Sequence, residues 1–366
     1  MNATYEARRR LLPLLRRLPE PVEASARILL RAGRADEARP YGEIAYNDPP
    51  GGQSHEMPNV SRRSVRADSV VVLLYHRVAE DPDDPFRLSV APRRFEEHMR
   101  ILKRHAEPVT LGEVLKRGRR PRVAVTFDDG YADNLLAGGP ILAAESMPTT
   151  VFVTSGSIGS ERPLWPLRLE ELFRLGEART DVIDLDIARN VLTIRTPRGG
   201  SSTGDLMAAH DLLTPLHPSI TAEAMQQLEV HFGGNVPTGS RRMLSEQEVR
   251  AMAATDIFTV GSHTRTHAWL SALDDTDLDN EVAGSKADLE SLTGRPVTEF
   301  AYPFGTRISF GRSATHALRR AGFALACTTF DDPVAPGTSR YLVPRRPVHD
   351  WSGPEFEGRL LSWLAA

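Results

Sequence analysis

Residues 123–130 have the sequence VAVTFDDG. The first five side chains are apolar or β-branched, which is typical of a strand buried on both faces, and two adjacent carboxylates follow where that strand ends. Similar runs lie at 70–75 and 149–153, and helical spacing at 92–105 and 131–145 separates the three runs. Strands and helices that alternate in this way are typical of parallel β/α architectures. We therefore predict an α/β fold around these strands.

The alternation is interrupted between residues 164 and 239 and then resumes. Within the interruption, the pattern predicts an amphipathic helix, a β-hairpin and two further helices, at 164–175, 182–196, 205–216 and 221–232. Beyond it, the pattern predicts more helices and short strands, at 245–254, 257–260, 274–293, 300–302, 310–321, 323–327 and 354–364. We predict a β/α barrel over residues 67–366 that carries residues 164–239 as an α/β insertion.

Residues 1–66 differ from the rest of the chain. Helical spacing in this segment is broken by Pro13, Pro19 and Pro21, and residues 40–64 have the composition of a linker. The basic and apolar residues at 8–17 also suit a helix on a membrane surface, although Pro13 interrupts its apolar face. We expect an N-terminal extension that is partly helical or disordered.

Composition excludes several classes of protein. The chain has 366 residues, a formal net charge of −3 and one cysteine, so it lacks the charge of a nucleic-acid-binding protein and the cysteines of a disulfide framework or thiolate zinc site. No apolar run is long enough for a transmembrane helix, and the first 18 residues lack the apolar core of a signal peptide. We expect a cytoplasmic protein, with peripheral membrane association as the alternative.

Chemistry-bearing side chains follow the predicted strands. Asp128 and Asp129 come at the end of one strand, and His263 and His267 come after another. One carboxylate and two imidazoles form a three-ligand set that leaves positions open for water and substrate, and the second carboxylate suits a general base. The simpler alternatives are an ordinary Asp-Asp-Gly turn and two solvated loop histidines.

Three other features lie at the same predicted rim. The turn at 302–305, which contains Phe304, exposes backbone N–H groups that suit a developing oxyanion. His76 follows the first strand, where a structural role is the simpler interpretation. Arg345 suits either the orientation of a carboxylate or a place on the surface.

Taken together, these motifs resemble a known family. The sequences TFDDG at 126–130, SHTRTH at 262–267 and AYPFG at 301–305 resemble the polysaccharide deacetylase family, also called the NodB-homology family or carbohydrate esterase family 4. The sequence YHRV at 75–78 resembles the subgroup related to poly-N-acetylglucosamine deacetylases. The resemblance implies a distorted (β/α) barrel, an N-acetylated glycan substrate and a place in exopolysaccharide biosynthesis. It also implies a divalent metal, for which Zn²⁺ suits the ligands and Co²⁺, Ni²⁺ or Fe²⁺ would also bind.

The resemblance assigns roles to five of these residues. Asp128 matches the catalytic base of the family, and Asp129, His263 and His267 match its metal ligands. The backbone N–H of Phe304 matches the group that stabilises the tetrahedral oxyanion.

Two further roles are less uniform within the family. His76 matches the general acid of the subgroup, and His349 is an alternative because many relatives place the acid near the C-terminus. Many relatives also carry an arginine that orients the base at the position of Ala301. We predict that Arg345 takes the place of that arginine.

The implied reaction is hydrolytic N-deacetylation of an amino sugar in a poly- or oligosaccharide or a glycan precursor, in which metal-activated water attacks the acetamide. The alternatives are an O-acetyl esterase and a catalytically silent carbohydrate-binding module on the same fold, in which Trp165, Trp269 and Trp351 would stack on sugars. A serine esterase is a formal alternative because residues 200–204 fit the G-x-S-x-G pattern, but no buried strand leads into them.

Overall fold

The computed structural model describes residues 65–175, 182–187, 190–195, 203–233 and 241–366. Its main sheet is parallel throughout, with the strand order β11-β10-β9-β6-β5-β1-β12, and β4 pairs with β5 beside this path. The strands are β1 (Val70–Tyr75), β4 (Glu107–Pro108), β5 (Arg122–Phe127), β6 (Thr149–Val153), β9 (Phe258–Ser262), β10 (Glu299–Ala301), β11 (Leu325–Cys327) and β12 (Arg346–Pro347). Two short strands, β2 (Arg77–Val78) and β3 (Ser89–Val90), pair with each other.

The strands are apolar on both faces because alternate side chains enter two different clusters. Val70, Val72 and Ala124 join an interior cluster with Cys327, whereas the residues between them, such as Val71, join the larger cluster under the helices. Every residue of β1, β5 and β6 is buried. This double burial explains why the sequence shows continuous apolar runs rather than alternation.

One segment near the C-terminus connects the two ends of the sheet. Val343 pairs with Cys327 of β11 through a parallel bridge, and its N–H donates to the carbonyl of Ala326. Four residues later, Pro347 of β12 pairs with Leu74 of β1. The sheet therefore curls round on itself into a distorted (β/α) barrel, as the sequence predicts.

Helices cover the outside of this barrel. They are α4 (Pro92–His105), α5 (Gly139–Ala144), α9 (Glu246–Ala253), α10 (Asp275–Thr293), α11 (Arg312–Arg320) and α12 (Gly353–Ala365), with shorter helical turns η2 (Leu111–Glu113), η3 (Asn134–Gly138), η4 (Ser155–Ser157) and η5 (Leu270–Ala272). Local signals fix several ends: Ser245 and Glu248 form a capping box at α9, and Gly294 ends α10 with a φ of 65°. The predicted helix at 131–145 is divided into η3 and α5, because Pro140 cannot donate a backbone hydrogen bond.

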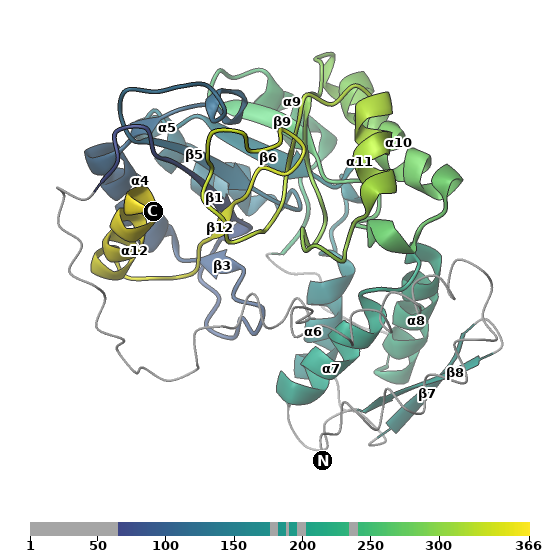
Figure 1. Ribbon diagram of the computed structural model, residues 1–366. Helices are drawn as coiled ribbons and strands as arrows, with labels where there is room; N and C mark the ends of the chain where they lie inside the picture. The colour runs from purple at the N-terminus through teal and green to yellow at the C-terminus, as the bar shows by residue number, and fades with distance from the viewer. Residues whose placement is uncertain (1–64, 176–181, 188–189, 196–202, 234–240) are drawn as a thin grey trace.

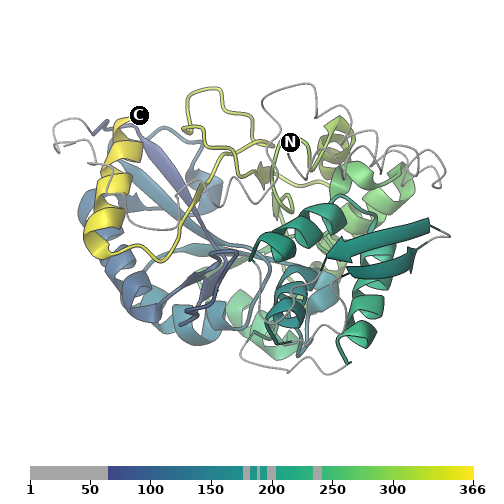
Figure 2. The same cartoon turned by 90° about the horizontal axis from the view of Figure 1, so that it is seen from below.

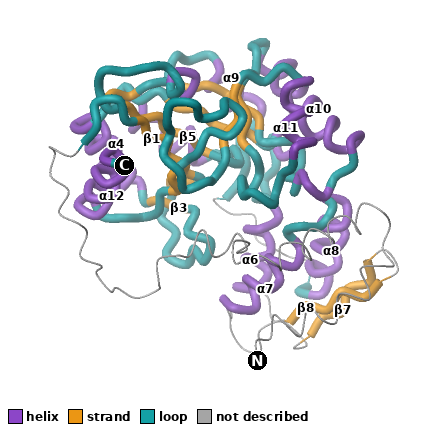
Figure 3. Tube along the Cα trace, in the orientation of Figure 1, coloured by secondary structure: helices purple, strands orange, loops and turns teal. Residues whose placement is uncertain are grey.

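The described elements of the predicted insertion form a lobe, whose apolar cluster also includes Phe86, Tyr131 and Met243 from outside residues 164–239. Its elements are α6 (Trp165–Leu175), the antiparallel hairpin β7 (Val182–Ile187) and β8 (Asn190–Arg195), α7 (Thr203–Leu213) and α8 (Pro218–His231). In Figures 1 and 3 this lobe lies below the barrel, away from α4 and α12, and the view from below in Figure 2 shows the same separation. Its two ends meet at the barrel, where Met243 N–H donates to Ser160 O at 3.0 Å.

The structure confirms the predicted fold class and most of the predicted elements. β9 continues two residues beyond the predicted strand, to Ser262, so His263 follows it directly. Residues 1–64, the hairpin turn at 188–189 and most of the G-x-S-x-G stretch lie outside the described residues. No helix in the described part of the chain is long and apolar enough to cross a membrane.

Candidate metal centre and active site

The C-terminal ends of β5 and β9 bring the predicted site residues together. Asp128 and Asp129 follow β5, and His263 and His267 follow β9, two strands away in the sheet. All four side chains are buried. In β/α barrels this is the end at which active sites lie.

Asp129, His263 and His267 have the geometry of a metal site. Their candidate ligand atoms all lie within 4.8 Å of one another, and Oδ1 of Asp129 is 3.5 Å from His263 Nε2 and 3.4 Å from His267 Nε2. The same Oδ1 is buried and accepts no hydrogen bond. His263 Nδ1 lies 2.8 Å from the carbonyl of Ala301 and donates to it, so in the neutral ring Nε2 has the lone pair that a metal needs. These residues therefore fit a divalent cation.

Charge and burial keep Asp129 and His267 in their ligating forms. Burial alone would raise the pKa of Asp129, but the adjacent imidazoles of His263, His267 and His76 hold it well below its usual value. Burial lowers the pKa of His267 to about 4. A carboxylate that stays ionised and an imidazole that stays neutral are the protonation states that metal ligation requires.

The backbone around the site is strained. Asp129, Thr264, His267 and Phe304 all have φ between 59° and 77°, the left-handed region that non-glycine residues rarely adopt. Such conformations cost of order 1 kcal/mol or more each and persist where surrounding contacts enforce them, often at functional sites. Four of the six non-glycine residues with positive φ in the described chain belong to the three motifs.

Asp128 is held by Arg345, which is completely buried. The guanidinium donates from Nη1 to Oδ1 at 2.6 Å and from Nη2 to Oδ2 at 2.7 Å, while its Nε donates to the carbonyl of Thr328. Val343 points into the barrel interior, and two residues later Arg345 does the same. Ala301, which the sequence analysis matches to the arginine of the family, lies in that interior cluster, and the guanidinium that contacts Asp128 comes instead from the residue before β12.

Of the other three candidate residues, His76 and Phe304 line the pocket and His349 lies elsewhere. His76 lines the pocket above the metal centre and is close enough for its charge to act on both carboxylates. His349 is not among the described pocket-lining residues; its Nδ1 lies 3.0 Å from the carbonyl of Arg87. Phe304 lines the pocket too, with its ring centroid 4.7 Å from that of His267.

The pocket contains residues that the sequence analysis did not identify. The space over the metal centre is about 500 Å³ with its open mouth included, and part of its lining comes from the β2–β3 loop and the insertion: Phe86, Leu88, Leu164, Pro166 and His210. No local sequence signal marks these residues, because only the folded lobe brings them to the site. Of the tryptophans considered for sugar stacking, Trp269 and Trp351 are buried by packing, and none of the three lines the pocket.

Comparisons with known proteins agree with this geometry. A family model described as polysaccharide deacetylase matches residues 116–204 and 216–326, which is more than half of the chain. The chain belongs to the polysaccharide deacetylase family. The Bacillus subtilis protein YxkH, whose name assigns it provisionally to the polysaccharide deacetylases, is 30% identical over 112 residues. These residues are 29% of this chain and 39% of that protein.

Solved structures show the same fold. IcaB from Ammonifex degensii is 20% identical, with a TM-score of 0.53 over 82% of this chain and 99% of its own. The deacetylase PplD of Streptococcus pyogenes, solved in complex with acetate, is 15% identical, with a TM-score of 0.53 over the same shares of the two chains. At these identities the likeness concerns the deacetylase fold alone, so the roles of individual residues depend on the geometry described above.

Proposed function

We propose that this member of the polysaccharide deacetylase family hydrolyses the acetamide of an N-acetylated amino sugar in a glycan or glycan precursor and releases acetate. The observation that carries this proposal is the buried Asp129–His263–His267 set, beside which Arg345 holds a second carboxylate, Asp128. A silent binding module would need neither a three-ligand set nor an ion-paired base. We propose Zn²⁺ as the cation, because one carboxylate and two imidazoles suit it.

When bound, a divalent cation supplies Lewis-acid activation of water and of the amide carbonyl. Burial would raise the pKa of Asp128, but the charge and hydrogen bonds of Arg345 outweigh burial and lower it, so Asp128 is ionised and accepts the proton of the attacking water. The backbone N–H of Phe304 is assigned to the developing oxyanion. His76 protonates the departing amine, and its place in the pocket lining favours it over His349.

The proposal is tested by acetate release from a panel of N-acetylated oligosaccharides, before chelation, after chelation and after restoration of Zn²⁺. O-acetylated analogues in the same panel separate amide from ester hydrolysis. We expect metal-dependent release from at least one N-acetylated sugar, and its loss in Asp128→Asn with the metal content unchanged. Absence of metal-dependent release throughout the panel contradicts the proposed function, and an active Asp128→Asn contradicts the assignment of the base.

A further inference from the structure

The pocket over the metal centre has a wall that the barrel strands do not supply. Phe86 and Leu88 come from the β2–β3 loop, Leu164 and Pro166 from the start of the insertion, and His210 from α7. Phe86 and Leu164 belong to the apolar cluster of the insertion, and Leu88 packs against it. We refer to these five residues as the insertion wall.

Aromatic rings continue from this wall to the metal centre. The ring of His210 lies 5.0 Å from that of Phe86 and stacks on Trp165 at 5.3 Å with an interplanar angle of 20°. Trp165 also packs against the cluster of Trp269 and Phe304, and the Phe304 ring is next to His267. A ligand whose acetamide reaches the metal centre therefore meets aromatic and apolar surface around its ring.

The charge of the pocket is also informative. Its described lining contains two carboxylates and four histidines but no lysine or arginine. The guanidiniums of Arg77 and Arg345 are both buried: Arg77 lies over the Tyr131 ring and pairs with Asp81 and Asp133, and Arg345 donates to Asp128. The described lining thus offers no lysine or arginine for a phosphate next to the reacting sugar.

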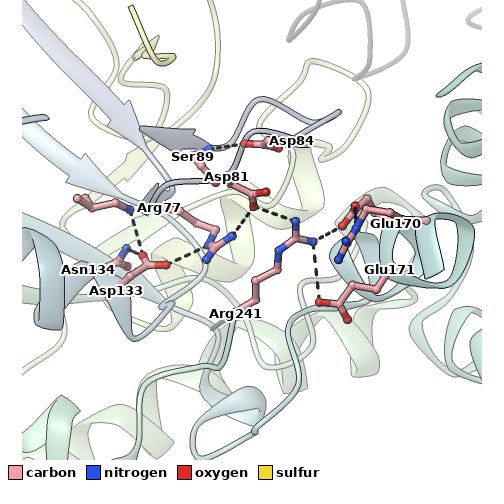
Figure 4. A network of polar contacts seen from close by, with 11 residues as sticks. Arg77, Asp81, Asp84, Ser89, Asp133, Asn134, Glu170, Glu171 and Arg241 are labelled. Atoms are coloured by element: carbon pink, nitrogen blue, oxygen red, sulfur yellow. Dashed lines mark hydrogen bonds and ion pairs between the residues drawn. The ribbon is translucent and has the colours of Figure 1, made fainter. Parts of the chain in front are cut away.

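A buried ion-pair network holds the insertion wall in place (Figure 4). Arg241, at the end of the insertion, pairs with Glu170 of α6 and, at 2.8 Å, with Asp81, which also accepts from Arg77 at 3.1 Å. In the same loop, Asp84 accepts from the N–H of Ser89 at 2.6 Å. The network therefore joins the loop that carries Phe86 and Leu88 to the helix that begins at Trp165.

We propose that the insertion wall is a subsite for a neutral pyranose ring, and that it selects uncharged glycosides over sugars that carry a phosphate at the anomeric oxygen. A pyranose presents C–H groups on its faces and packs on aromatic and apolar side chains, whereas an anion placed against the insertion wall loses its hydration without gaining a lysine or arginine partner. This inference rests on the proposed function, since it names the substrate class of the same site.

The test measures binding by calorimetry in Zn²⁺-loaded Asp128→Asn, in which turnover does not interfere. The ligands are the N-acetylglucosamine disaccharide, the methyl glycoside of that disaccharide and N-acetylglucosamine 1-phosphate. Phe86→Leu removes a ring from the wall but keeps apolar volume. The matched control is Phe173→Leu, which makes the same change in the same apolar cluster at a residue that does not line the pocket.

We expect the two neutral ligands to bind more tightly than the phosphate, and Phe86→Leu to weaken their binding by about tenfold, while Phe173→Leu changes it by less than about twofold. Equal effects of the two substitutions, tighter binding of the phosphate, or no binding of either neutral ligand overturns the proposal. Acetate release by the wild-type protein is recorded separately. If the neutral ligands bind in a way that depends on Phe86 but no acetate is released, the proposed function is refuted and the proposed subsite is not.

Discussion

The pair formed by Arg345 and Asp128 leads to a quantitative prediction. Arg345→Met removes two charge-assisted hydrogen bonds of 2.6 and 2.7 Å and leaves a buried carboxylate without its counter-charge. Removing one partner of a buried ion pair costs about 3–5 kcal/mol. We expect the free energy of unfolding to fall by about 4 kcal/mol, and acetate release to fall by about a hundredfold because Asp128 is no longer positioned.

The measurement is urea-induced unfolding of the metal-free protein, followed by circular dichroism, in a double-mutant cycle. In the Asp128→Asn background, Arg345→Met leaves no buried carboxylate without a counter-charge. The loss in free energy of unfolding caused by Arg345→Met is therefore smaller there by about 2–3 kcal/mol. The hydrogen bonds of Arg345 to Thr328 and Thr126 are lost in both backgrounds and cancel. The control is Arg346→Met, whose partner Asp331 is exposed and for which we expect no coupling to Asp128. Equal cost of Arg345→Met in both backgrounds refutes the reasoning.

Three further predictions concern metal, pH and the lobe. His263→Ala should lose most of the bound Zn²⁺ by atomic absorption after dialysis, and full retention contradicts its role as a ligand. Burial lowers the pKa of His98 to about 4 in the folded protein, so the unfolded chain takes up the proton first as the pH falls. The contribution of neutral His98 to the free energy of unfolding is therefore complete above pH 6.5 and decreases by about 3 kcal/mol toward pH 4. Urea unfolding at several pH values should show a flatter dependence for His98→Gln, and an identical dependence excludes this cause. Arg241→Met leaves the buried Glu170 without its counter-charge, so we expect the free energy of unfolding to fall by about 3 kcal/mol. We also expect a raised KM for neutral glycosides with unchanged metal content. An unchanged KM contradicts a role of the network in substrate binding.

Much of the fold could be predicted because the information is local. The buried strands are continuous apolar runs, and the ends of α9 and α10 carry capping residues that the sequence displays. The two-residue strands β2, β3, β4 and β12 could not be predicted, since so short a segment has no periodicity and depends on its partner strand.

The candidate site also has one part that could be predicted from the sequence and another that could not. Asp128, Asp129, His263 and His267 stand directly after strands or in short motifs, so their convergence could be expected. The contact of Arg345 with Asp128 depends on which residues of the segment before β12 face the barrel interior, and the sequence of that segment leaves this open. The insertion wall depends on how a whole lobe packs, which no motif within it records.

The segment that joins the two ends of the sheet also has a consequence for synthesis of the protein. It carries Arg345, which contacts a carboxylate 217 positions earlier in the chain. A ribosome has therefore passed residue 345 before that charge can be neutralised. Until then Asp128 lacks its counter-charge and the sheet is not closed, so the apolar edges of its strands stay open to quality-control proteases.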